Sequence, residues 1–114
     1  MKDIESRITY NDKEYLIVFN LNVMQEIQEK YGTIQKWADL TDNVEEPNAK
    51  AVIDGFTSMI NEGIDIDNER NGTDIKPLTK KQVGRMITEI GLAKSAETLQ
   101  NTVIESTQSA EKNA

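Results

Sequence analysis

The sequence predicts an α+β fold, in which an N-terminal β-hairpin packs against four to five α-helices and a disordered tail ends the chain. Two short runs with alternating apolar side chains flank a polar turn near the N-terminus. Later segments carry apolar residues at helical spacing, separated by glycines and polar turns. The chain of 114 residues has the length of one domain. We therefore expect a single domain over residues 1–104 and, because the last residues are nearly all polar, a disordered tail over residues 105–114.

The hairpin is expected over residues 6–10 and 15–20, with its turn at residues 11–14. The turn begins with Asn-Asp, two residue types that tolerate left-handed backbone and bond their own main chain. The second run has apolar side chains on both of its faces, which predicts burial on both sides. An isolated hairpin is only marginally stable in water, so the helices must cover it.

Two helices are expected directly after the hairpin, over residues 22–31 and 34–40. Asn20 or Asn22 can serve as the N-cap of the first helix. Gly32 then ends that helix as a left-handed C-terminal cap. Each helix has an apolar stripe, which predicts that both pack on the core.

Trp37, in the second of these helices, has two interpretations. Tryptophan is enriched in binding hot spots, so this side chain is a candidate anchor for a partner protein. Ile34 and Leu40 lie at helical spacing from it, however, and we favour a place in the core for this group.

A third helix is expected over residues 48–61. Gly55 lies at its middle, where glycine costs helix stability, and this indicates that another element packs closely there. Residues 63–77 are rich in polar side chains and glycine, and they are expected to form a long polar loop.

The acidic part of this loop invites comparison with the calcium-binding loop of EF-hand proteins. If the pattern starts at Asp67, Leu78 takes the last position, where a bidentate Glu is needed. If it starts at Asp65, Arg70 takes the position that requires glycine. Both registers fail, so the sequence predicts a mobile acidic loop and no calcium site.

A fourth helix is expected after Thr79, because Thr79 and Gln82 fit a capping box, and Gly91 ends or bends this helix. A last helix over residues 92–104 has a thin apolar stripe among polar residues. Such a helix either docks on the core or orders only on a partner. The sequence leaves both possibilities open.

The composition excludes most enzyme classes. The chain contains no cysteine and no histidine, so it lacks thiolates, the commonest general base and the commonest transition-metal ligand. It also has no glycine-rich phosphate loop, no nucleophile motif and no cluster of metal ligands. We therefore expect a non-enzymatic protein without a cofactor or metal.

The net charge is −7, and acidic residues concentrate between residues 39 and 69. This region is either an acidic face for a basic partner or, as we favour, a set of solvated helix faces. Its charge repels phosphate groups, so we expect no nucleic-acid binding. No apolar run approaches the ~20 residues of a membrane span, and the first residues lack a signal-peptide core. We expect no membrane association.

At these residues the chain resembles the tail assembly chaperones of long-tailed phages and prophages of Gram-positive bacteria. The resemblance covers about residues 6–93 and begins at the hairpin. Residues 22–37, NVMQEIQEKYGTIQKW, are similar to that family's two helices joined at an aromatic-Gly-small-apolar junction. Residues 56–64 and 77–84 are similar to its later helices.

The resemblance implies a non-enzymatic role in the cytoplasm of the host bacterium. Such proteins bind the long tape measure protein and help tail-tube subunits to assemble around it. Under this hypothesis the partner-binding side chains lie on the apolar stripe of the fourth helix or on the last helix. The candidates are Val83, Met86, Ile87, Ile90, Leu92 and Leu99.

Two other classes of function stay open. One is another small structural protein of the phage particle, such as a tail completion or connector protein. The other is an acidic phage-encoded inhibitor of a host nucleic-acid enzyme, which the charge of residues 39–69 suggests.

Overall fold

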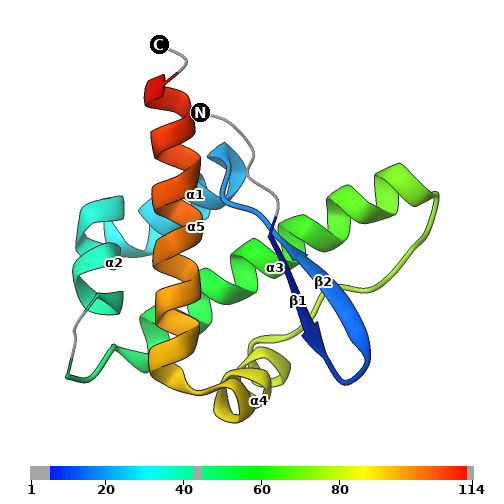
Figure 1. Ribbon diagram of the computed structural model, residues 1–114, viewed down its shortest axis with the longest axis horizontal. Helices are drawn as coiled ribbons and strands as arrows, with labels where there is room; N and C mark the ends of the chain where they lie inside the picture. Colours follow the sequence, from blue (N-terminus) through cyan, green and yellow to red (C-terminus); the bar gives the residue numbers. More distant parts are fainter. Residues whose placement is uncertain (1–5, 43–44, 113–114) are drawn as a thin grey trace.

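The computed structural model, which describes residues 6–42 and 45–112, has the predicted α+β architecture (Figure 1). Residues 1–5 and 43–44, and residues 113–114 of the expected tail, lie outside these ranges. The elements are β1 (Ser6–Tyr10), β2 (Lys13–Ile17), α1 (Leu21–Tyr31), α2 (Ile34–Thr41), α3 (Ala49–Asn71), α4 (Lys80–Ile90) and α5 (Leu92–Lys112).

Helix α3 is the central element of the fold. It crosses the middle of the molecule in Figure 1 and contacts β2 and the four other helices. The hairpin lies on one side of it, and α2 and α5 lie on the other. The core therefore forms around α3, and its largest fully buried side chains include Phe19, Trp37 and Phe56.

The hairpin is tighter than predicted. Tyr10 pairs with Lys13, so the turn consists of Asn11 and Asp12 alone. Both have positive φ angles, 51° and 63°, which is the conformation of a type I′ turn. The expected four-residue turn is wrong. A type I′ turn matches the right-handed twist of the two strands, so Lys13 and Glu14 pair with β1 and belong to β2. Burial on both faces of the second run is confirmed, since Leu16, Ile17, Val18 and Phe19 are all buried.

The expected boundaries of α1 and α2 are confirmed within one residue. In both helices the side chain of the N-cap residue accepts a backbone hydrogen bond. The Asn20 side chain accepts from the backbone N–H of Val23, and the Thr33 hydroxyl accepts from that of Lys36. Gly32 ends α1 as predicted, but its φ of 87° and ψ of −51° are not those of the expected left-handed cap.

Trp37 lies in the core, as predicted. Its indole N–H donates to the Ala51 carbonyl at 2.9 Å, and its ring covers Gly55, where a side chain would overlap it. The expectation of a close approach at Gly55 is therefore confirmed. Leu40 was expected in the core as well, and this is wrong, because it is 39% exposed. Thr41 is buried instead, and it lies about two helical turns after Ile34 on the same face of α2.

Helix α3 ends ten residues later than predicted, at Asn71, so much of the expected long loop is helical. Gly63 does not end the helix, because it lies inside α3 where the backbone of Leu16 approaches too closely for any side chain. The helix ends at Asn71, and Gly72 forms a left-handed cap with φ 63° and ψ 32°. The acidic residues compared with an EF-hand loop are thus on a helix.

The segment after α3, residues 73–79, is shorter than the predicted loop and is bonded to α3 at two asparagines. The Asn68 side chain donates to the carbonyl of Ile75 and accepts from its N–H, each at 3.0 Å. The Asn61 side chain makes the same pair of bonds with Leu78, at 3.0 and 2.8 Å. The segment therefore runs back along α3.

Helix α4 has the predicted capping box between Thr79 and Gln82 and ends at Gly91, whose φ is 105°. Helix α5 docks on the core, with Ala96 and Leu99 buried. This decides between the two possibilities that the sequence left open.

Helix α5 continues across the domain boundary predicted between residues 104 and 105 and ends at Lys112. Ser106 is buried, and its hydroxyl donates to the Phe19 carbonyl at 3.0 Å. The polar composition of this segment is compatible with such packing, because small hydroxyl side chains can pack on a core. Those of Thr98, Thr102 and Thr107 donate to carbonyls one turn earlier in the helix.

Candidate functional site

The candidate partner-binding residues do not form an open apolar surface. Val83, Met86, Ile87 and Leu99 are at most 4% exposed and belong to the core. Ile90 and Leu92 are partly buried against the same core. The stripe of α4 thus packs mainly on α3 and α5, and a partner's contact with these residues stays a prediction.

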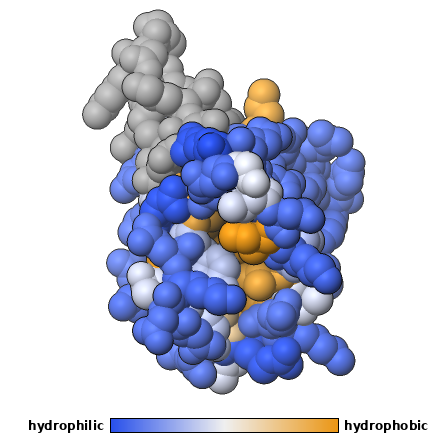
Figure 2. Space-filling view, turned by 90° about the vertical axis from the view of Figure 1, so that its right-hand side faces the viewer, coloured by the Kyte–Doolittle hydropathy of each residue, from blue (hydrophilic) through white to orange (hydrophobic). Residues whose placement is uncertain are grey.

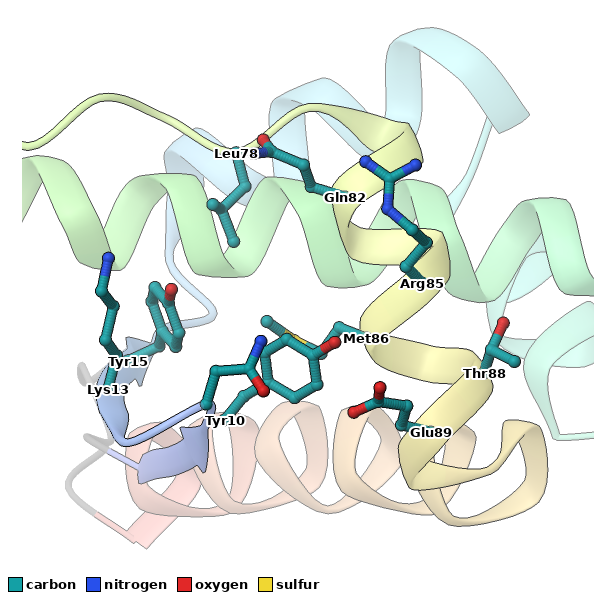
Figure 3. Close-up of a pocket in the computed structure, with 10 residues that line it drawn as sticks. Tyr10, Lys13, Tyr15, Leu78, Gln82, Arg85, Met86, Thr88 and Glu89 are labelled. Atoms are coloured by element: carbon teal, nitrogen blue, oxygen red, sulfur yellow. The ribbon is translucent and has the colours of Figure 1, made fainter.

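A hollow of about 500 Å³ lies between the hairpin and α4 (Figure 3). Tyr10 and Tyr15 enter it from the hairpin, and the Met86 side chain extends from α4 toward Tyr10 (Figure 3). Polar side chains of α4 stand at its edge. The lining residues are Tyr10, Asn11, Lys13, Tyr15, Leu78, Gln82, Arg85, Met86, Thr88 and Glu89.

A second hollow, of about 520 Å³, adjoins the first on the other side of Tyr15. The two share Lys13, Tyr15 and Leu78. Its other lining residues are Glu14, Ile64, Asp67, Ile75 and Lys76. Figure 2 views the molecule from the side where the hairpin and the C-terminal end of α3 lie, and it shows apolar surface ringed by hydrophilic side chains. We call the two hollows together the hairpin groove.

The strand register explains why these side chains meet. Tyr15 pairs with Ile8 and Lys13 pairs with Tyr10, so all four lie on one face of the two-stranded sheet. Part of this face covers the core, and its end near the turn stays partly exposed. The end near the turn therefore presents two tyrosines and a lysine to the groove.

Hydrogen bonds hold the walls of the groove in place. Arg7 of β1 binds both carboxylate oxygens of Asp67 on α3, at 3.0 and 3.2 Å. Asn61 and Asn68 fasten residues 73–79, as described above, and the capping box orients the start of α4. A rigid wall lowers the entropy cost of binding, so the groove is suited to a partner.

The groove combines apolar side chains with charges of both signs. Arg85 and Lys13 supply positive charge, and Glu89 supplies negative charge beside the Tyr10 hydroxyl. Partial burial, the charge of Glu89 and a hydrogen bond to it raise the pKa of the Tyr10 phenol. Tyr10 therefore stays a neutral hydrogen-bond donor at physiological pH.

Several acidic residues of α3 are bonded within the chain, in addition to Asp67. Glu62 accepts from the side chains of Asn20 and Asn22, at 2.6 and 2.8 Å. Asp54 is buried, with its side chain 4% exposed, and it accepts from the Tyr31 hydroxyl at 2.7 Å. These carboxylates connect elements of the fold, which weighs against a dense acidic surface that imitates nucleic acid.

Asp54 also pairs with three lysines from three helices. Its Oδ1 lies 2.9 Å from the Lys80 Nζ and 3.8 Å from the Lys30 Nζ, and its Oδ2 lies 3.1 Å from the Lys50 Nζ. Burial by itself would raise the pKa of Asp54, but hydrogen bonds from Tyr31, Lys80 and Lys50 and the charge of Lys30 outweigh it and lower the pKa to about 2.

Acid is expected to remove the stabilisation that Asp54 provides. A carboxylate whose pKa is lower in the folded state than its ordinary value of 3.8 stabilises the fold above that value. The contribution of about 2 kcal/mol should disappear as the pH falls from about 4 to about 2. Urea unfolding of the wild type and Asp54→Asn at pH 6 and pH 2.5 measures this.

The matched control for this prediction is Asp65→Asn, which changes an exposed carboxylate on the same helix. The stability gap between the wild type and Asp54→Asn should narrow strongly in acid, whereas Asp65→Asn should stay close to the wild type at both pH values. A gap for Asp54→Asn that is equal at both pH values would contradict the assignment.

Comparisons of the chain with known protein families, with curated proteins and with solved structures give no match. In the part of the chain that the structure describes, no group of three acidic residues is placed to hold a metal ion, and no helix there is long and apolar enough to cross a membrane.

Sequence reasoning placed the apolar residues of the hairpin correctly by face but did not identify the groove. Tyr10 shares a face with Ile8, and Tyr15 shares one with Ile17, as the period of two in a strand requires. The signal that could have revealed the groove is the pair of tyrosines flanking a tight turn, since tyrosine is suited to half-buried surfaces. That Leu78 and Met86 lie opposite them depends on the packing of α4.

Proposed function

We propose that this protein is a phage tail assembly chaperone that binds a segment of the tape measure protein in the hairpin groove. The observation that carries the proposal is the groove itself, which has an apolar floor, charged edges and walls held by hydrogen bonds. The resemblance of residues 6–93 to such chaperones supports the same function.

The groove has the chemistry that this role requires. A tape measure segment awaiting assembly exposes apolar side chains, and such surfaces aggregate unless they are covered. Tyr10 and Tyr15 provide rigid aromatic contact area, and Ile75, which is 56% exposed, adds apolar surface in the second hollow. The net charge of −7 keeps a complex with an apolar segment in solution. Binding would take place in the host bacterial cytoplasm, before tail-tube subunits assemble around the tape measure protein.

Co-expression with the tape measure protein of the same phage or prophage tests the proposal. We expect the wild type to raise the soluble fraction of the tape measure protein and to copurify with it. The double variant Tyr10→Ser and Arg85→Glu removes one aromatic contact and reverses one edge charge in the groove. It should weaken binding about tenfold or more, as expected for hot-spot residues.

The matched control is Lys94→Glu, a charge reversal at an exposed position of α5 that does not line the groove. It should bind like the wild type. If the tape measure protein is equally insoluble with and without this chain, the chaperone function is refuted. Finding the chain as a component of purified virions would instead favour a structural role in the particle.

A further inference from the structure

Three helices each direct a lysine toward the buried carboxylate of Asp54. Asp54 lies in the N-terminal half of α3, whereas the second hollow of the hairpin groove lies beside its C-terminal half. Lys30 comes from the last turn of α1, Lys50 from the first turn of α3, and Lys80 is the first residue of α4. We call these three residues the lysine cluster. Their side chains are 43%, 74% and 55% exposed, so the ammonium groups remain accessible to solvent.

The lysine cluster carries more positive charge than Asp54 can balance. Three ammonium groups face one carboxylate, which leaves an excess of about two positive charges. The two carboxylate oxygens of Asp54 already have Tyr31, Lys50 and Lys80 as donors at hydrogen-bond distance. Since each ammonium group has three N–H donors, most of the donors in the cluster point elsewhere.

Lys30 and Lys80 act on each other, since hydrogen bonds to Asp54 and to Lys30 raise the pKa of Lys80, whereas the pKa of Lys30 is lowered. Contact with Lys80 is the largest cause that lowers the pKa of Lys30, followed by burial, and the charge of Lys50 lowers it further. Lys50 also lies over the Tyr31 ring, 5.3 Å from its centroid, which helps to hold its ammonium group in place.

A hollow of about 490 Å³ opens beside the cluster. It is lined by Lys50, Ile53, Asp54, Lys80, Lys81 and Gly84. Lys81 adds a further positive charge, and the first turn of α4 adds the positive end of a helix dipole. The missing side chain at Gly84 leaves space in the hollow, since a Cβ there would meet only Ile53, at 3.7 Å.

We propose that Lys50, Lys80 and Lys81 bind a phosphate-class dianion, either inorganic phosphate or the phosphate of a monoester, in this hollow, and that Lys30 adds positive charge beside it. The charge of a phosphate dianion equals the excess charge of the cluster. Lysines act as separate point charges around a compact anion, whereas a planar carboxylate is better matched by the fork of an arginine. The rest of the chain is acidic and repels anions, so binding elsewhere is disfavoured. This site is independent of the hairpin groove and of the proposed chaperone function.

The test is a titration of the full chain with inorganic phosphate, followed by NMR of the amides and of the lysine side chains. It is run at pH 8, with chloride added to keep the ionic strength constant. We expect saturable shifts that fit one site and centre on Lys50, Lys80 and Lys81. A parallel titration with phenyl phosphate distinguishes the two sources, because its apolar ring gains affinity over inorganic phosphate if the wall at Ile53 contacts it.

The variant Lys50→Gln with Lys81→Gln is expected to weaken phosphate binding about tenfold or more. It keeps the Lys80 and Lys30 pairs with Asp54, and thermal unfolding without phosphate verifies that it is folded. Lys94→Gln on α5 is the control and should bind phosphate like the wild type. Shifts that grow linearly with phosphate, or equal affinities of the double variant and the wild type, would overturn the proposal.

Discussion

Replacing Gly63 with alanine is expected to destabilise the protein by about 3 kcal/mol or more. A Cβ at this position would overlap the carbonyl carbon and oxygen of Leu16. Both atoms belong to the backbone of β2, which is held in the hairpin and buried against α3, so neither can rotate away. Alanine favours the helix over glycine by about 1 kcal/mol, which is too little to offset the overlap. The hairpin must therefore move away from α3.

Urea unfolding followed by circular dichroism measures this effect. The matched control is Gly84→Ala, another glycine within a helix, where the nearest side-chain atom would lie at an ordinary contact distance of 3.7 Å. That substitution should be neutral or stabilise the protein by up to about 1 kcal/mol. If Gly63→Ala is as stable as Gly84→Ala, the close contact between α3 and β2 is wrong. Because β2 also bears one side of the groove, Gly63→Ala should weaken partner binding as well.

Replacing Trp37 with alanine is expected to cost about 3–5 kcal/mol, the usual range for deleting a large buried aromatic side chain. Trp37 is fully buried and joins α2 to α3. Its ring fills the space that Gly55 leaves open, and its N–H is the partner of the Ala51 carbonyl. The variant leaves a cavity at this contact and loses the hydrogen bond.

Circular dichroism is again the suitable probe, since Trp37 is the chain's one tryptophan and its fluorescence is lost with it. Trp37→Phe should lie between the alanine variant and the wild type, because it keeps part of the ring volume and loses the hydrogen bond. Leu40→Ala is the control on the same helix, and it should cost less than about 1 kcal/mol because Leu40 is 39% exposed. Equal losses for Trp37→Ala and Leu40→Ala would mean that Trp37 does not occupy the core.

Local signals predicted the short helices well. Asn20, Thr33 and Thr79 accept backbone hydrogen bonds as N-caps, and Gly32 and Gly91 end their helices. These signals are reliable because a cap satisfies backbone groups within a few residues of itself, whatever the rest of the chain does. The same reasoning failed at Gly63, because glycine has two uses in a helix. It can end the helix through a left-handed conformation, or it can let another backbone approach.

The hairpin groove and the lysine cluster were not predictable in the same way. Tyr15 and Leu78 are far apart in the sequence, and they meet because Asn61 and Asn68 hold residues 73–79 along α3. The lysines of the cluster come from three helices and are ordinary surface residues in the sequence pattern. Their common partner, Asp54, appeared only as one of many acidic residues in the middle of the chain.

The sequence by itself determined the class of fold, the hairpin, and the ends of three of the helices, because these depend on caps, turn residues and periodicity within a few positions. The tertiary structure decided the length of α3, the docking of α5 and the two candidate sites. It did so because each of these depends on contacts between distant segments: Gly63 against Leu16, Ser106 against Phe19, and three lysines around Asp54. Such contacts form only when the core brings the segments together, and no local pattern specifies them.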